Sequence, residues 1–231
     1  MSIETTKATA VNSETKQDHS VLVAGDTIRF LIAEVALHLH IGFGGEVCAS
    51  HDSIANFCQV NSDGKLSVES GGKVHSSYVN RGGCLHVRGE GTAYNTRVEQ
   101  GMVQIYSDGQ ASNTYAVSSG TVNVKKHGLA IYTKLDNGRM NVEAGGLARN
   151  TTINNHGFLW VCSGGAAKDV VINQGWVHVS KGAVIDYAVL NDRGNIIVYS
   201  GGTLTNLRQH GGHVFVEDGG VVTRADKTNY Y

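Results

Sequence analysis

Hydrophobic and polar residues alternate with a period of two in short segments, and these segments recur every 18 or 19 residues. One glycine marks each repeat. A Val, Leu, Ile or Met stands two positions after it, and a Val, Ile or Ala stands four positions after it. The spacing Gly-x-Φ-x-Val predicts a short β-strand with alternate residues facing inward. The marker glycines are Gly45, Gly64, Gly83, Gly101, Gly120, Gly138, Gly157, Gly175, Gly194 and Gly212.

A second short segment follows a second glycine in each repeat, as in TAYNTRV (92–98) and LARNTTI (147–153). Two strands and two turns within 18 or 19 residues make one coil of a solenoid, and such coils stack in parallel about 4.8 Å apart. The sequence therefore predicts an all-β parallel solenoid of about nine or ten coils over residues 42–227. We expect a polar tail at 1–20, an N-terminal cap at 21–41 and a short C-terminal tail at 228–231.

Composition narrows the functional classes. The chain has 30 Gly and no Pro, which suits a fold with many tight turns. Its net charge of −1 provides no broad basic field for nucleic acid or anionic lipid. The apolar stretch 28–41 contains Arg29 and Glu34 and is too short to span a bilayer, so we expect no membrane insertion by this chain. The polar N-terminus has no apolar region of the kind found in secretory signals.

Metal and cofactor sites are not predicted. The four cysteines have no zinc-ligand spacing, and His38 and His40 lack a third ligand at a defined spacing. The segment GFGGEVC (42–48) lacks the lysine and the helix that a phosphate-binding loop needs. Cys48 and Cys58 fall in one coil and could approach each other, but free thiols are the favoured state.

Three segments carry a family resemblance: GEGTAYNTRV (89–98), SDGQASNTYAV (107–117) and EAGGLARNTTINNHGFLWV (143–161). They resemble the AIDA-type repeats of bacterial autotransporter adhesins, closely over 61–227 and loosely over 42–60. The resemblance implies a right-handed parallel β-helix at the bacterial cell surface that mediates adhesion or self-association. It also implies possible O-glycosylation, since some members carry sugars on Ser or Thr of the repeats.

Two columns of polar residues follow the second glycine. The first is a ladder that invites two interpretations: amides stacked from coil to coil, or, at Asp169 and Asp186, a carboxylate pair at the spacing of a retaining glycosidase. Stacking is favoured, because a catalytic pair at a turn would lack a basic neighbour. The ladder consists of Asn95, Asn113, Asn150, Asp169, Asp186 and Asn206.

The second column holds hydroxyl residues that either stack inward or, facing outward, accept glycans by analogy with the family. The inward role is favoured. The column begins with Ser77, Thr96, Thr114, Thr133 and Thr151, and continues as Val170, Tyr187 and Leu207. The candidate glycan acceptors are Thr96, Thr114, Thr133 and Thr151.

The outward face of the marker strands changes from polar to aromatic midway along the chain. We call its later residues the aromatic band: Phe158, Trp160, Trp176, His178, Ile197, His213 and Phe215. Contiguous apolar residues on a surface usually mark an interaction site. The candidate partners are a second copy or another surface protein, then the chain's own N-terminal segment, then a carbohydrate. The sequence predicts a non-catalytic surface protein for display, adhesion or self-association. The alternatives are a filament-forming solenoid and, with less support, a polysaccharide-binding or polysaccharide-cleaving spike.

Overall fold

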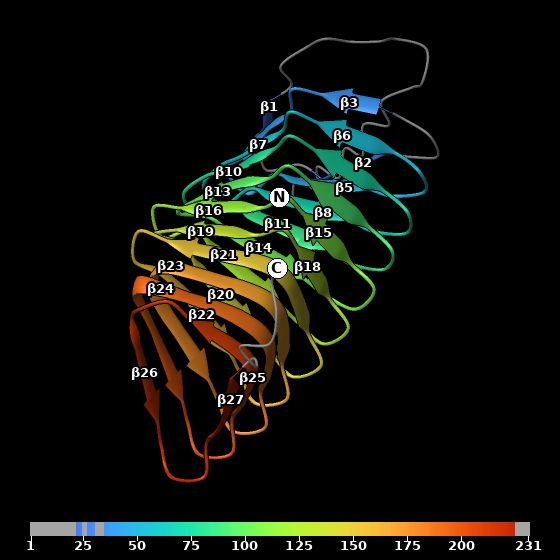
Figure 1. Cartoon of the computed structure of the whole chain (residues 1–231). Helices are drawn as coiled ribbons and strands as arrows, with labels where there is room; N and C mark the ends of the chain where they lie inside the picture. Colours follow the sequence, from blue (N-terminus) through green and yellow to red (C-terminus); the bar gives the residue numbers. More distant parts are fainter. Residues whose placement is uncertain (1–21, 25–26, 31–34, 225–231) are drawn as a thin grey trace, which may run out of the picture.

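The computed structural model describes residues 22–24, 27–30 and 35–224. These residues form a stack of parallel strands without a helix, and Figure 1 shows one coil following another along the stack. The prediction of an all-β parallel solenoid of about ten coils is confirmed. The strands of the first six coils are β1 (Leu22–Ala24), β2 (Thr27–Phe30), β3 (Val35–Leu37), β4 (His40–Gly42), β5 (Glu46–Ala49), β6 (Ile54–Asn56), β7 (Gln59–Val60), β8 (Lys65–Val68), β9 (Lys73–His75), β10 (Tyr78–Val79), β11 (Cys84–Val87), β12 (Thr92–Tyr94), β13 (Arg97–Glu99), β14 (Met102–Ile105), β15 (Gln110–Ser112), β16 (Tyr115–Val117), β17 (Thr121–Val124), β18 (Leu129–Ile131) and β19 (Lys134–Asp136). Those of the later coils are β20 (Arg139–Val142), β21 (Leu147–Asn154), β22 (Gly157–Val161), β23 (Ala166–Val179), β24 (Val184–Val198), β25 (Thr203–Gln209), β26 (His213–Val216) and β27 (Val221–Arg224).

Most coils contain three strands, where the sequence predicted two. The second segment bends at one residue with a left-handed backbone, for example Tyr132 with φ 53° between β18 and β19. Short Asn and Asp side chains tolerate this conformation best, and they occupy half of the column. In β21, β23, β24 and β25 a single strand runs through the bend. The left-handed residues are His38, Phe57, Ser76, Asn95, Asn113, Tyr132, Asn150, Asp169, Tyr187 and Asn206.

The marker glycines allow each coil to lie close to the one before it. A Cβ atom built on Gly120 would lie 2.2 Å from the carbonyl oxygen of Val98. No side chain fits in that space, which is why this position is glycine in every repeat. Two residues further on, Val122 pairs with Val103 of the previous coil and Met140 of the next.

The inward positions form one continuous core. Val122, Val124, Met140 and Val142 are fully buried, and the equivalent residues from Val47 to Val198 are buried with them. The predicted register of the marker strands is therefore correct. In the last described coil the same columns end at Val214, which is partly buried, and Val216, which is exposed.

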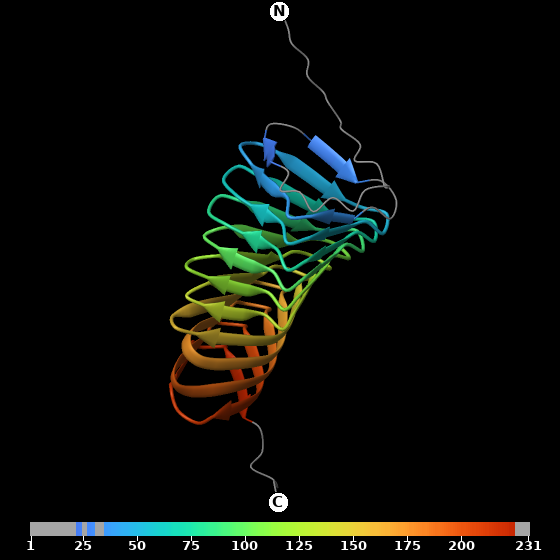
Figure 2. The same ribbon diagram turned by 90° about the horizontal axis from the view of Figure 1, so that it is seen from above.

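The segment predicted as an N-terminal cap contributes strands to the stack. β2 pairs in parallel with β5, β3 with β6, and β4 with β7, so residues 27–30 and 35–42 are in register with the next coil. Figure 2 shows these strands and the coil of β26 and β27 at opposite ends of the stack. The tails predicted at 1–20 and 228–231 lie outside the described residues.

Candidate functional site: an aromatic band and a neighbouring depression

Two outward columns on the marker strands contain the aromatic band. One column runs Arg139, Phe158, Trp176, Asn195, and the other runs Asn141, Trp160, His178, Ile197, with each residue beside the next on adjacent coils. His213 and Phe215 of β26 end the two columns. The pairing therefore brings together all seven residues that the sequence predicted for this surface.

The centre of the band is a cluster of aromatic rings around His178. Its ring centre lies 4.7 Å from that of Phe158 and 6.0 Å from that of Trp160. Tyr199, which the sequence analysis did not include, places its hydroxyl 3.1 Å from His178 Nδ1. Burial among these rings lowers the pKa of His178, and the positive charge of Arg139 lowers it further. The repeat did not predict this contact, because Tyr199 lies 21 residues after His178 whereas equivalent residues are 18 or 19 apart.

Large apolar surfaces of the band remain exposed. The exposed fractions are 39% for Trp160, 38% for Trp176 and 51% for Phe215. The described N-terminal strands lie at the other end of the stack (Figures 1 and 2). Within the described part of the chain, the band is open to a partner.

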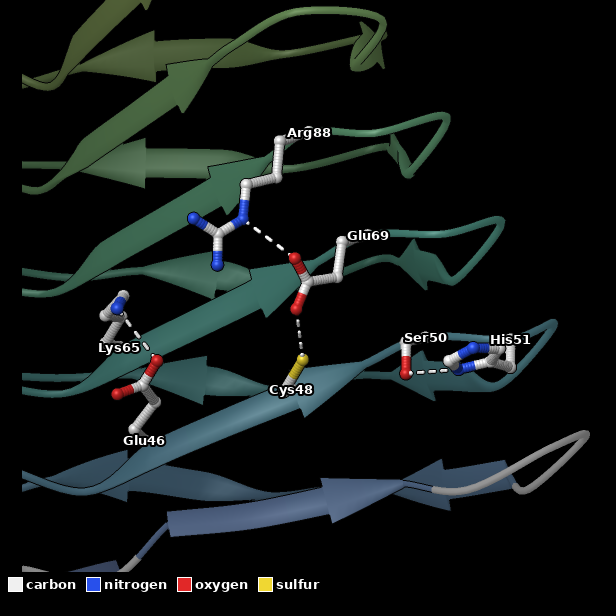
Figure 3. Close-up of polar contacts among 7 residues, drawn as sticks. All are labelled: Glu46, Cys48, Ser50, His51, Lys65, Glu69 and Arg88. Carbon is white, nitrogen blue, oxygen red and sulfur yellow. Dashed lines mark hydrogen bonds and ion pairs between the residues drawn. The ribbon is translucent and has the colours of Figure 1, made fainter.

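In the early coils the outward face carries charged pairs instead, both on the marker strands and just beyond their ends. Lys65 Nζ lies 2.8 Å from Glu46 Oε1, and Arg88 Nε donates a 2.9 Å hydrogen bond to Glu69 Oε2 (Figure 3). Cys48 Sγ donates to the other oxygen of Glu69 at 3.0 Å (Figure 3). Charged pairs of this kind hold neighbouring coils in register and suit a hydrated face. The aromatic band is thus confined to the later coils.

A depression of about 340 Å³ adjoins the band. Its lining comes from three coils: Ser119, Thr121, Asn137, Gly138, Arg139, His156 and Phe158. The guanidinium carbon of Arg139 lies 4.9 Å from the centre of the Phe158 ring. Ser119, Asn137 and His156 stand in left-handed turns one residue before the marker glycines, with φ of 68°, 56° and 63°. The sequence analysis did not identify this hollow, because its walls come from different coils.

The carboxylate pair, the less favoured interpretation of the ladder, is out of register. Asp186 lies in register with Lys168 and Thr205, while Asp169 belongs to the left-handed column, as does Tyr187 on the next coil. The ladder consists of the residues four positions after the second glycine of each repeat, which is Gly165 for Asp169 and Gly182 for Asp186. In the structure Ala183, and not Gly182, lies opposite Gly165, which shifts Asp186 by one residue. Asp186 also has the basic neighbour that was predicted to be missing, since Lys168 Nζ lies 3.4 Å away. The remaining ladder does stack in places, as where Asn113 donates to Asn95 Oδ1 at 3.2 Å.

The threonine column faces inward. Thr96, Thr114, Thr133 and Thr151 are each 1% exposed, and none of their hydroxyls has a hydrogen-bond partner among the described residues. A glycosyltransferase cannot reach a hydroxyl inside the folded stack, so the structure argues against these four as glycan acceptors. The same shift at Gly182 corrects the later part of the column, where Ala188, and not Tyr187, follows Val170.

The cysteines and histidines form no metal or disulfide site in the described ranges. All four cysteines are free thiols, and burial raises the pKa of Cys58 to about 11. No group of three or more potential metal ligands occurs in the part of the chain that the structure describes. His38 and His40 are not brought into such a group. Across the described ranges we also find no helix with the length and apolarity needed to cross a membrane.

Comparison with known proteins places the fold. No protein-family model matches the chain, and no curated protein matches its sequence. Among solved structures, it superposes on the TibC-catalysed hyper-glycosylated TibA fragment with a TM-score of 0.69 and 24% identity, over 90% of this chain and 92% of that one. TibA is an autotransporter adhesin of the AIDA type. The chain has the fold of the TibA passenger. A second structure, the Agl-KA catalytic domain, aligns with a TM-score of only 0.25 and 12% identity, over 89% of this chain and 59% of that domain, and carries no argument.

Proposed function

We propose that this chain is a non-catalytic, surface-displayed β-helix that mediates adhesion through self-association. The proposal rests on the aromatic band. Inward columns are apolar in every coil because they build the core, whereas the outward columns become aromatic only in the later coils, without a need from packing. Large exposed aromatic side chains are typical of the centre of protein interfaces. The fold shared with TibA supports a location at the cell surface.

A second copy is the occupant that fits the geometry best. The marker strands present a flat sheet face, on which the two tryptophans stand on adjacent coils with about two-fifths of their surface exposed. Two such faces can pack against each other symmetrically, as in an isologous dimer. A carbohydrate or another surface protein would use the same rings.

Sedimentation velocity of the purified chain tests the proposal. Replacement of Trp160 and Trp176 by Ala should weaken association by about 2 kcal/mol or more, which is the loss typical of interface hot spots. The matched control is Tyr78→Ala, which removes an exposed ring from β10 on a different face. A large loss of stability in the monomeric double variant, with association unchanged, would show that the chain covers the band itself.

The last described coil favours a second mode of assembly. Val216 and Val221 are each 48% exposed, and β26 and β27 have one unpaired edge among the described residues. An open edge with apolar ends can add further strands. End-to-end stacking of solenoids would then give filaments, which negative-stain electron microscopy distinguishes from lateral pairs. Val216→Asp should abolish filaments and leave lateral pairs intact.

A further inference from the structure

The depression beside the aromatic band combines a cation, an aromatic ring and neutral polar groups. The cation is Arg139, the ring is that of Phe158, and the polar groups belong to Ser119, Thr121 and Asn137. None of its lining residues is acidic. We propose that it binds a single acidic sugar, with the sugar carboxylate on Arg139 and the sugar hydroxyls on the polar wall.

The shape follows from the repeat. On each of the three coils the residue before the marker glycine stands in a left-handed turn, and the residue after it lies in the marker strand. Both line the hollow, so each coil supplies one side chain to each wall. Gly138 lies between Asn137 and Arg139, and because it has no side chain it does not fill the bottom of the hollow. The short side chains of Ser119 and Thr121 on one coil, followed by Arg139 and Phe158 on the next two, turn this groove into a hollow.

Arg139 is available for an anion. Among the described residues it has no carboxylate partner, in contrast to Lys125, which pairs with Glu143. The carboxylate next to the hollow in sequence, Asp136, is occupied by hydrogen bonds from Asn155 Nδ2 at 2.6 Å and Tyr115 Oη at 2.9 Å. A guanidinium that lies over an aromatic ring makes this contact with its face. Its N–H groups point outward in the guanidinium plane and stay free to bind a carboxylate with two hydrogen bonds.

The remaining wall favours a sugar acid over a simple anion. Sugar hydroxyls both donate and accept hydrogen bonds, and the hydroxyls of Ser119 and Thr121 and the amide of Asn137 can do the same. His156 Nε2 lies 3.5 Å from Gln174 Nε2, which leaves Nδ1 of His156 for the sugar. The Phe158 ring gives the hollow an apolar surface beside its polar wall, which suits the C–H groups of a pyranose. The volume of about 340 Å³ lies at the lower end of small-molecule sites, about 300–1,000 Å³, which suits one sugar unit.

Titration calorimetry with matched sugars tests this site. Methyl glucuronide and N-acetylneuraminic acid are the two acidic probes, and methyl glucoside is the neutral counterpart of the first. We expect an acidic sugar to bind at least tenfold more tightly than the glucoside, since hydrogen bonds to a charged group are stronger than those between neutral groups. Preference for one acid identifies the source as a uronic or a sialic acid. Binding of the glucoside as tight as that of the acids, binding of sodium acetate as tight as that of the sugar acids, or no binding of either acid, overturns the proposal.

Variants link the binding to the hollow. Arg139→Gln should lower the affinity at least tenfold, while Arg149→Gln, which removes an exposed arginine from β21, should leave it unchanged. Circular dichroism and thermal melting check that both variants fold. Equal affinity of the Arg139 variant and the native chain would overturn the site. The site does not rest on self-association, so the Trp160→Ala, Trp176→Ala double variant should still bind the sugar, even if sedimentation shows that the interface proposal is wrong.

Discussion

The ammonium nitrogen of Lys168 lies 3.4 Å from Asp186 Oδ2 on the following coil. The other carboxylate oxygen of Asp186 accepts hydrogen bonds from Asn206 Nδ2 at 2.8 Å and Thr205 Oγ1 at 2.9 Å. These bonds, with that of Asn206 first, lower the pKa of Asp186 and keep it ionised at neutral pH. A lowered pKa argues against a role for Asp186 as a general acid, which has to carry a proton at the working pH.

Replacement of Asp169 and Asp186 by Asn should leave the chain folded and its melting temperature nearly unchanged. Both side chains are on the outside of the stack, where single polar contacts contribute little. A reducing-sugar assay on a panel of polysaccharides should give the same blank result for the native chain and the double variant. Cleavage by the native chain that disappears in the variant would show that the protein is an enzyme.

Val124→Asp should destabilise the chain by about 4 kcal/mol or more, because it places an unpaired charge in the core. Val124 is fully buried between Ile105 and Val142. The matched control is Asn123→Asp, since the neighbouring residue faces outward and accepts a 2.8 Å hydrogen bond from Asn141 through an oxygen that aspartate retains. Urea unfolding measures both, and equal losses would mean that the inward and outward faces are wrongly assigned.

Thr151→Val should leave stability unchanged or raise it by about 1 kcal/mol. The Thr151 hydroxyl is buried without a described partner, and the next coil already has Val170 in this position. Removing an unsatisfied buried hydroxyl while keeping the shape removes a desolvation cost. Ser77→Ala provides the contrast, because Ser77 Oγ accepts from the Cys58 N–H at 3.1 Å and donates to the His75 carbonyl at 3.2 Å. Its loss should cost about 1–2 kcal/mol. A clearly destabilising Thr151→Val would show that this hydroxyl is hydrogen-bonded in solution.

Acidification should weaken the aromatic cluster. Because burial and then Arg139 lower the pKa of His178, the unfolded chain binds a proton at a higher pH than the folded chain does. The free energy of unfolding should therefore fall as the pH drops below about 6.5, the ordinary pKa of histidine, until the lower pKa of folded His178 is passed. Thermal melts between pH 7 and 5 should show a smaller fall for His178→Gln than for the native chain. His210→Gln, in an exposed turn, is the control, and identical slopes for the native chain and the His178 variant would contradict the prediction.

The sequence by itself determined the length of the repeating coil and which of its marker-strand residues face the core. The alternation around each marker glycine assigns residues such as Val122 and Val124 to the core, because side chains on a strand point to opposite faces in turn. The requirement for glycine at Gly120 follows from the same repeat, and the structure gives its cause in the carbonyl of Val98.

Only the tertiary structure decided which residues are neighbours across coils. The pairing of Asp186 with Lys168 depends on a register that the glycine pattern misplaced by one residue, and one residue of slip moves a side chain to the other face. The left-handed bend at Tyr132 likewise divides a segment that reads as one strand. The hollow around Arg139 needs side chains from three coils, up to 39 residues apart between Ser119 and Phe158, and exists only when backbone pairing has set their order.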